Sequence, residues 1–258
     1  MRIFKDLYQY RELLKTNVRK EIRGKYKGSF LGVLWSFINP LLMVLVYAIV
    51  FPLILKSSEP NYVIFLIVGI IPWNFFTTVI NQGTTTVVNN GNIIKKVYFP
   101  REILPISVVT SGLINFFISC IIILIFIIFG GMSLSPVMLL LPLIAIIQYI
   151  LSLGIIFILS AINVYVRDIE YIVNFIVMML FYATPILYSS ELFANTAFEW
   201  IMYVNPMAHI INAYRDIFYY QVLPDFSILA IVGIISCAIL IIGYQIFKKL
   251  EKRFAEEL

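Results

Sequence analysis

The chain has 258 residues, of which 61% are hydrophobic and 13% are charged, with a formal net charge of +5. Soluble domains carry about twice that charged fraction, and a chain of this length could not hide so much apolar surface from water. The composition therefore excludes a soluble protein. It indicates one integral membrane unit that is too short to hold a separate soluble catalytic domain.

The chain starts with a charged segment that comes before the first apolar run. Over residues 3–22, Ile3, Leu7, Leu14 and Val18 recur at helical spacing, with basic side chains between them. A basic amphipathic helix of this kind suits the anionic inner surface of a membrane, and it could equally pack against a cytoplasmic partner. Because the first apolar run starts only after about 27 residues of mixed charge, we expect no cleavable signal peptide.

Five stretches of the chain contain no Asp, Glu, Lys or Arg, and a helix needs roughly 20 apolar residues to cross a bilayer core. The stretch 103–166 has 64 residues, enough to cross twice, and Gly130-Gly131 with Pro136 divides it into a helical hairpin. The sequence therefore predicts an all-α polytopic membrane protein with six transmembrane helices. Its single transmembrane domain, 1–258, comprises an amphipathic interface helix over 1–27, spans over 32–55, 62–85, 103–129, 137–165, 171–189 and 226–247, a cytoplasmic helix over 88–102 and an outer re-entrant segment over 190–225.

Lysine and arginine are distributed unevenly between the two sets of predicted loops. With the N-terminus in the cytoplasm, 17 of the 19 basic residues fall on the cytoplasmic side, and only Lys56 and Arg215 lie outside. Loops on the cytoplasmic side of membrane proteins carry an excess of these residues. We therefore expect both termini to be cytoplasmic.

The outer segment 190–225 differs from a simple loop because it is rich in aromatic residues, has few charges and breaks at Asn205-Pro206. We expect one or two short helices that dip back into the outer leaflet, where protein or a water-filled cavity covers their backbone. An interfacial aromatic belt without a functional role is the alternative. The aromatic residues are Phe193, Phe198, Trp200, Tyr203, Tyr214, Phe218, Tyr219 and Tyr220.

The chain has no motif that supports catalysis. His209 is its only histidine, no pair of carboxylates lies within a predicted span, and the sequence G-x-x-x-x-G-K-[ST] that would bind ATP is missing. Cys120 and Cys237 both fall in apolar spans, where we expect free thiols. We therefore expect no enzyme activity, no metal site and no cofactor bound by this chain. If it is a transporter, its energy must come from another subunit.

The loop between the second and third predicted spans is the most distinctive cytoplasmic feature. A short helix over 88–102, ending in Tyr98 and Phe99 and stiffened by Pro100, could plug a cleft in a partner protein. Aromatic and arginine side chains are typical anchors of protein interfaces. The alternative is an ordinary positively charged loop whose aromatic residues sit at the lipid headgroups.

Six short motifs occur in order along this hydropathy pattern, and each is weak when taken alone. They are Arg23-x-x-Tyr26-x-x-Ser29-x-Leu31-Gly32-x-x-Trp35 with Pro40, Gly69-Ile70-Ile71-Pro72-Trp73-x-Phe75-Phe76, Lys96-Val97-Tyr98-Phe99-Pro100-Arg101 with Leu104-Pro105, Val166-Arg167-Asp168-Ile169, Thr184-Pro185-Ile186-x-Tyr188, and Asn205-Pro206. Together they are specific. Along nearly its whole length the chain resembles the membrane subunits of type-two ABC exporters, in the branch that exports lipid-linked polysaccharides such as O-antigen, capsule and teichoic acid.

The resemblance implies a homodimer in the bacterial cytoplasmic (inner) membrane, paired with two copies of a separate ATPase subunit that would bind ATP and Mg. It also implies a coupling helix in the cytoplasmic loop, which would sit in a groove of the ATPase, and a second small contact after the fourth span. The amphipathic helix would clamp the complex at the membrane surface. The coupling residues would be Lys95, Lys96, Tyr98, Phe99, Pro100 and Arg101, with Arg167 and Asp168 in the second contact.

The implied cargo is a glycan carried on undecaprenyl diphosphate. Arginine and lysine just before the first span would hold the diphosphate at the inner leaflet, although the same residues also fit the ordinary positive-inside signal. These residues are Arg19, Arg23, Lys25 and Lys27. Aromatic residues would let the polymer slide, although each could instead serve helix packing. These channel aromatics are Trp35, Phe37, Trp73, Phe75, Phe76, Tyr182 and Tyr188. Tyr219 and Tyr220 would form an outer gate.

Three other functions compete with this interpretation. A type-two ABC exporter of a drug or another lipid would have a similar overall plan. An ion-driven secondary transporter is disfavoured because acidic residues are missing from the spans and no internal repeat is visible. A membrane-embedded transferase would need clustered acidic or histidine residues at a membrane face, and the spans have none. The sequence does not name the glycan.

Overall fold

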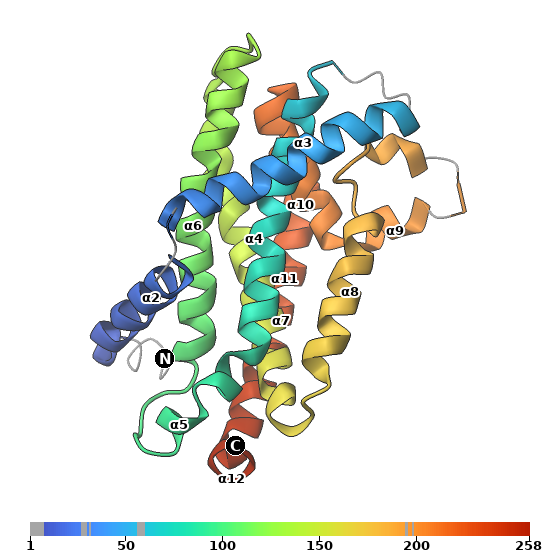
Figure 1. Cartoon of the computed structure of the whole chain (residues 1–258). Coiled ribbons are helices and arrows are strands. Elements are labelled where there is room, and N and C mark those ends of the chain that lie inside the picture. Colours follow the sequence, from blue (N-terminus) through green and yellow to red (C-terminus); the bar gives the residue numbers. More distant parts are fainter. Residues whose placement is uncertain (1–7, 27–29, 31, 56–59, 194–195, 198) are drawn as a thin grey trace.

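The computed structural model describes residues 8–26, 30, 32–55, 60–193, 196–197 and 199–258. Within these ranges the chain consists of helices and connecting turns, without a strand (Figure 1). The longer helices are α2 (Arg11–Tyr26), α3 (Trp35–Leu55), α4 (Tyr62–Asn89), α6 (Ile103–Phe129), α7 (Leu141–Tyr165), α8 (Ile169–Ala183), α10 (Pro206–Arg215) and α11 (Phe226–Leu250). The short elements are η1 (Gly32–Leu34), α5 (Gly91–Ile94), η2 (Pro136–Leu140), η3 (Ser190–Phe193), α9 (Glu199–Val204), η4 (Asp216–Tyr220), η5 (Glu251–Arg253) and α12 (Phe254–Glu257).

Helix α4 forms the centre of the bundle. It packs against α3, α6, α7, α8 and α10, and residues from Ile64 to Val87 are buried along most of its length. Its Pro72 lies inside the helix, and the buried Gln148 of α7 donates a hydrogen bond of 2.9 Å to the carbonyl oxygen of Pro72. The hydroxyl of Tyr214 in α10 donates to the same glutamine side chain at 3.0 Å. One buried amide thus ties three helices together.

Four helical segments of the described chain are long and apolar enough to cross a membrane. They are Tyr62–Asn89, Ile103–Phe129, Pro136–Tyr165 and Phe226–Glu257. The glycine turn that divides the second from the third includes Gly131, whose φ of +74° favours a residue without a side chain. The chain is therefore a polytopic, all-helical membrane protein.

The fifth predicted span, 171–189, is shorter in the structure, whereas α3 covers nearly all of the first, with 21 residues over Trp35–Leu55. Helix α8 ends at Ala183 after 15 residues. A helix of that length spans only about 22 Å, which is less than the thickness of a bilayer core. The cause is Pro185, because a residue that precedes proline is driven out of the helical region, and Thr184 is extended with φ −110° and ψ 137°.

The structure differs from the prediction of one cytoplasmic helix over 88–102. Helix α4 continues to Asn89, α5 follows as a single turn, and residues 95–102 form two turns separated by the irregular stretch 97–100. The helical hydrogen bonds stop where the amide of Val97 donates to Ile93 at 2.9 Å. Pro100 has no amide hydrogen and disfavours a helical Phe99, so the helix does not continue, and a turn at Arg101 and Glu102 leads into α6.

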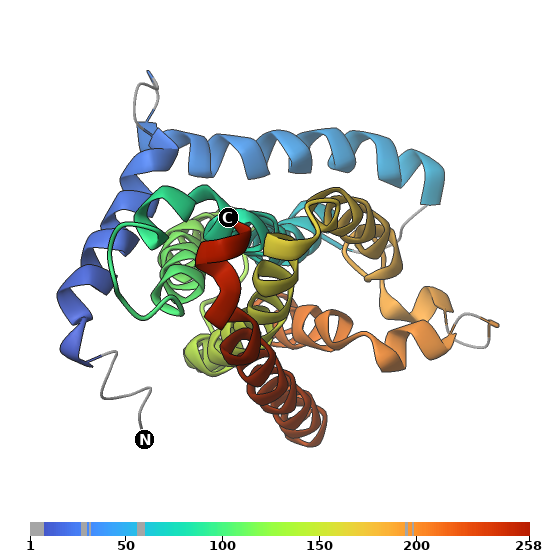
Figure 2. The ribbon, with the colours of Figure 1, turned by 90° about the horizontal axis from the view of Figure 1, so that it is seen from below.

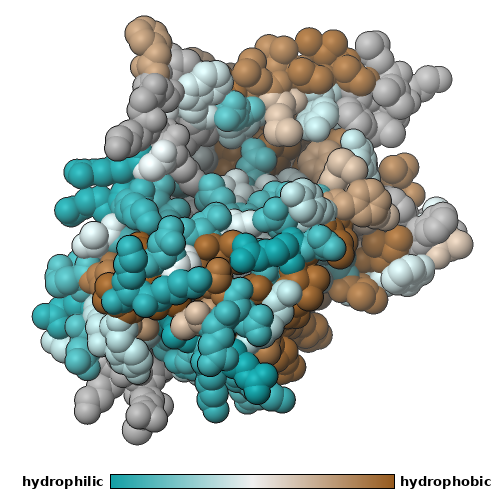
Figure 3. Space-filling view, turned by 60° about the horizontal axis from the view of Figure 1, so that its bottom comes forward, coloured by the Kyte–Doolittle hydropathy of each residue, from teal (hydrophilic) through white to brown (hydrophobic). Residues whose placement is uncertain are grey.

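The two ends of the described chain lie near the same end of the bundle. In Figures 1 and 2, α2 lies beside the lower part of α6, and α12 lies below α7 near α5. Figure 3 shows that this lower end is largely hydrophilic, whereas apolar side chains gather higher on the molecule. The predicted amphipathic helix forms over Arg11–Tyr26, and its expected start at residues 3–7 lies outside the described residues.

Candidate functional site

A cleft between α3, α4 and α6 has a volume of about 640 Å³. That volume lies within the usual range for ligand pockets, about 300–1,000 Å³. Aromatic and other apolar side chains form part of its wall, and uncharged polar side chains form the rest. Asp, Glu, Lys and Arg are missing from the described residues that line it. The polar lining residues are Asn39, Asn74, Thr78, Gln82, Asn115 and Ser119.

The polar residues of the cleft follow helical spacing, which places them on single faces of their helices. Asn74, Thr78 and Gln82 are each four residues apart on α4, and Asn115 and Ser119 are four apart on α6. Phe75 of α4 also lines the cleft, and its ring stacks on that of Phe116 from α6 with centroids 5.3 Å apart. The cleft therefore presents amides and hydroxyls beside aromatic faces.

A second, smaller cleft of about 310 Å³ lies between α2, α4 and α6. Gln82 lines both clefts, so the two adjoin at this residue. Below Gln82, Thr85 and Asn89 continue the polar face of α4 into the second cleft. We call the residues Asn74, Thr78, Gln82, Thr85 and Asn89 the α4 polar stripe. It extends from the middle of the helix to its last turn.

Helix α2 borders the lower end of the α4 polar stripe. Its Glu21 and Gly24 line the second cleft, and the ammonium group of Lys20 donates to the side-chain oxygen of Asn90 at 3.2 Å. The predicted diphosphate residues Arg19 and Arg23 are exposed on α2 and line neither cleft. The side chain of Lys25 and the whole of Lys27 lie outside the described residues.

The described channel aromatics separate into three groups. Trp35 and Phe75 line the first cleft. Trp73 and Phe76 are buried against each other with ring centroids 5.5 Å apart, and they line neither cleft. Tyr182 is exposed on α8 and accepts a hydrogen bond at its carbonyl oxygen from the hydroxyl of Tyr188. The side chain of Phe37 lies outside the described residues.

The predicted coupling loop presents part of its side chains outward and buries the rest. Tyr98 is 91% exposed, and Lys95, Lys96 and Val97 are exposed beside it. Phe99 is 7% exposed and packs inward, which removes it from the surface that a partner would contact. Pro100 and Arg101 are half-buried, whereas Arg167 and Asp168 are exposed in the turn after α7.

The predicted outer gate is split between a buried and an exposed tyrosine. Tyr219 is 7% exposed, its hydroxyl donates to the carbonyl oxygen of Pro60, and its ring meets Phe65 edge-on with centroids 5.5 Å apart. Tyr220 is exposed and meets the ring of Tyr219 edge-on at 4.9 Å. Tyr219 therefore packs η4 against α4.

Sequence reasoning missed the role of Arg215, which it counted only as a basic residue on the outer side. Arg215 is 1% exposed. Its guanidinium donates to the carbonyl oxygens of Pro185 and Ile186 and lies 3.5 Å from the centroid of the Phe65 ring. It fastens the turn after α8 to α4 at Gly69, where an added Cβ would lie 3.2 Å from this guanidinium.

Sequence reasoning also missed the polar residues of both clefts. The available signal was the four-residue spacing of Asn74, Thr78 and Gln82 within an otherwise apolar helix. Uncharged polar side chains on one face of a membrane helix point to a packed or wet surface, because hydrocarbon offers them no hydrogen bonds. Metal binding has no support among the described residues, which hold no group of three or more His, Cys, Asp or Glu suited to an ion.

Known proteins are similar to this chain over most of its length. The family described as ABC-2 type transporter matches residues 12–219. The O-antigen export system permease protein RfbA of Myxococcus xanthus is 36% identical over 259 aligned residues, which cover 100% of both chains. Two proteins of the same name from Klebsiella pneumoniae are each 38% identical and cover 96% of this chain and 95% of their own length. The similarity includes both clefts and the loop between α4 and α6.

Proposed function

The chain belongs to the ABC-2 type transporter family, and from this premise we propose that it is the membrane subunit of an exporter of O-antigen polysaccharide. Proteins named as O-antigen export permeases match it from end to end. The complete complex would be a homodimer with two copies of a separate ATPase that binds ATP and Mg. It would lie in the bacterial inner membrane with both termini in the cytoplasm.

The uncharged, polar and aromatic lining of the first cleft supports a glycan as the cargo. Sugar hydroxyls both donate and accept hydrogen bonds, as the side chains of Asn74, Thr78 and Gln82 do. Aromatic faces such as Phe75 offer apolar contact that depends little on the positions of the hydroxyls. A lining without fixed charges holds a neutral polymer loosely, which suits sliding. The described lining also lacks the ionisable side chains that an ion-coupled secondary transporter would use.

The glycan would reach this cleft along the α4 polar stripe from the cytoplasmic side. The second cleft would receive the first sugars, and the basic residues of α2 would remain near the undecaprenyl diphosphate at the inner leaflet. Arg19, Lys20 and Arg23 are the basic residues of this part of α2, and Lys20 already contacts Asn90 in the wall of the second cleft. Arginine and lysine bind phosphate through charge-assisted hydrogen bonds.

The cytoplasmic loop would dock on the ATPase mainly through Tyr98, the most exposed aromatic side chain described between α4 and α6. Lys95 and Lys96 are exposed beside it, and Arg167 with Asp168 would form the second contact. An exposed aromatic residue flanked by basic residues is a typical anchor in a partner's groove.

Two adjacent threonines of α4 provide a matched test of the cleft. Thr78 lines the cleft, whereas Thr77 does not. The hydroxyl of Thr77 donates a hydrogen bond of 3.3 Å to the carbonyl oxygen of Asn74 in the same helix. Valine has nearly the same shape as threonine but lacks its hydroxyl. We expect Thr78→Val combined with Gln82→Leu to lower surface O-antigen several-fold when the variant chain replaces the native one. We expect Thr77→Val to leave it unchanged.

The readout is the amount of polysaccharide on the cell surface, normalised to the amount of permease that co-purifies with the ATPase. Equal export by the cleft variant and Thr77→Val would show that the cleft is not the route. A wild-type chain that binds no ATPase would refute the exporter itself.

A further inference from the structure

The C-terminal segment Lys248–Leu258 contacts both cytoplasmic loops of the chain. Helix α12 packs against α5 and against the end of α7, and an added Cβ on Gly91 would lie 3.5 Å from the side chain of Leu258. The hydroxyl of Tyr165, at the end of α7, donates to the carbonyl oxygen of Leu250 at 2.8 Å. Tyr165 comes two residues before Arg167, so this contact lies directly behind the second predicted ATPase contact.

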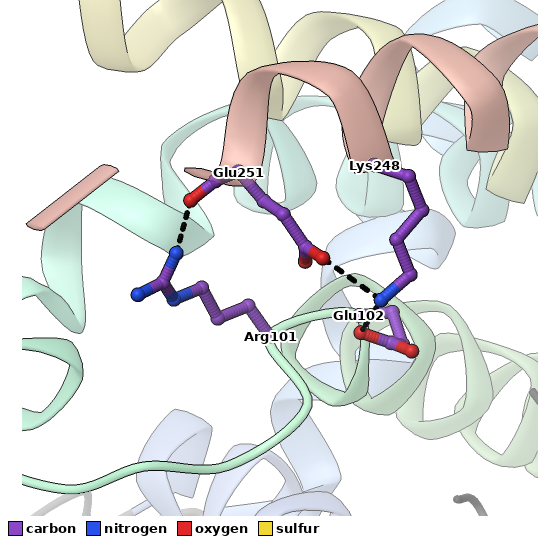
Figure 4. Close-up of polar contacts among 4 residues, drawn as sticks. All are labelled: Arg101, Glu102, Lys248 and Glu251. Atoms are coloured by element: carbon purple, nitrogen blue, oxygen red, sulfur yellow. Dashed lines mark hydrogen bonds and ion pairs between the residues drawn. The ribbon is translucent and has the colours of Figure 1, made fainter. Parts of the chain in front are cut away.

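An ionic cluster joins this segment to the start of α6 (Figure 4). The ammonium group of Lys248 lies 2.9 Å from a carboxylate oxygen of Glu102 and 2.9 Å from one of Glu251. The side chain of Glu102 is only 1% exposed, whereas that of Lys248 is 33% exposed. Arg101, the residue before Glu102, donates to the backbone carbonyl oxygen of Glu251.

An aromatic cluster lies beside these charges and fixes the same segment. Phe254 is fully buried, and its ring packs edge-on against that of Phe247 with centroids 5.5 Å apart. The ring of Tyr165 lies 6.4 Å from that of Phe254, and the guanidinium of Arg101 lies 6.0 Å from the same ring. The contacts therefore reach three separate elements: the loop before α6, the end of α7 and the end of α11.

The buried carboxylate of Glu102 gives this cluster its physical importance. A charge that is removed from water needs a partner, and a buried charge that loses its partner is strongly unfavourable. Glu102 is paired with Lys248, which is 146 residues away in the sequence. The loop before α6 can therefore separate from α11 only by leaving a charge uncompensated, so the two are expected to move together.

We propose that the C-terminal segment Lys248–Leu258 is a positioning brace, locked by Glu102 and Lys248, that holds both ATPase-facing loops and makes α6 and α11 respond together to ATP hydrolysis. Tyr98 projects outward from the loop in front of the brace, with 91% of its surface exposed. This role rests on the proposed function. Without the brace, a bound ATPase would displace the loop and α6 without moving α11.

Four variants separate this role from simple stability. Lys248→Met removes the ion pair, and Lys249→Met is the matched control because Lys249 is the exposed neighbour on the same turn of α11. Lys248→Arg keeps the charge and the donors. The double variant Glu102→Gln with Lys248→Met removes the unpaired buried charge together with the ion pair, so that the protein can accumulate while the brace remains broken.

The first measurement needs no partner. The purified full-length permease in detergent is treated with trypsin, and cleavage after Lys95 and Lys96 is followed by the masses of the fragments. We expect the double variant to be cut there several-fold faster than Lys249→Met, because its loop is released. We expect Lys248→Arg to match the wild type. Equal cleavage of the double variant and Lys249→Met would overturn the brace, whatever the protein exports.

The second measurement uses the complex of permease and ATPase. We expect the double variant to assemble and hydrolyse ATP, while its export per ATP falls about five-fold or more, the lower end of typical coupling between two sites. Export per ATP equal to that of Lys249→Met would overturn the coupling role. A wild-type permease that neither binds the ATPase nor exports glycan would instead refute the proposed function. In that case the trypsin experiment would still test whether the C-terminal segment holds the loop.

Discussion

The close packing of α7 on α11 makes Gly243→Ala the sharpest test of the structure. An ideal Cβ on Gly243 would lie 2.3 Å from the carbonyl oxygen of Gly154 in α7, about 1 Å closer than ordinary contact allows. This oxygen is a backbone atom, so the contact cannot be relieved by rotating a side chain. The two helices would have to move apart, and overpacking of this kind costs about 1–3 kcal/mol.

Gly233 lies on the same helix and provides the matched control, because a Cβ there would meet nothing within 4 Å. Alanine is a better helix former than glycine by about 0.5–1 kcal/mol in soluble helices. Gly233→Ala should therefore melt at or slightly above the wild-type temperature, whereas Gly243→Ala should melt several degrees below it. The assay is thermal unfolding of the purified chain in detergent at matched lipid content. If Gly243→Ala melts no lower than Gly233→Ala, the helices do not pack at the distance described.

Two further predictions concern the charged residues at the start of η4. Arg215→Met leaves the carbonyl oxygens that Arg215 now binds without their charged donor, which should cost about 1.5–3 kcal/mol. It should also speed hydrogen exchange over residues 184–188, and unchanged exchange there would contradict the fastening role. Burial and the nearby charge of Asp225 raise the pKa of Asp216 from 3.8 to about 6. The protonated carboxyl group of Asp216 therefore stabilises the folded state fully below pH 3.8. This stabilisation is lost as the pH rises through about 6. The melting temperature should fall between about pH 4 and pH 6, and Asp216→Asn should flatten that slope; a slope that persists in Asp216→Asn would assign it to other groups.

The long helices could be predicted from the sequence because their signal is local. A charge-free run of sufficient length and a glycine turn at Gly130-Gly131 define α6 and α7, and the structure places those helices over the same residues. Helix α8 ends early for an equally local reason, since Pro185 excludes a helical Thr184. That signal was present in the sequence, but a count of apolar residues does not register it.

The sites depend on which helix faces meet, and a single sequence does not state this. Trp73 and Phe75 are two residues apart, so they point to different sides of α4. Only the placement of α3 and α6 assigns Phe75 to the cleft and Trp73 to the packed core. The pairing of Glu102 with Lys248 is harder still to predict, because it joins residues 146 positions apart and follows no motif.

Helix α6 connects the brace to the cleft within one rigid element. It begins beside Glu102 at the brace and lines the cleft with Asn115 and Ser119, about 20 Å further along its axis. Between these points an ideal Cβ on Gly112 would lie 2.2 Å from the side chain of Val79, so α6 and α4 are packed too closely to slide independently. A displacement of the loop before α6 would therefore reach two of the three helices that line the cleft, α6 and α4. In the proposed complex, an ATPase bound at Tyr98 would change the shape of the glycan's route without contacting the glycan directly.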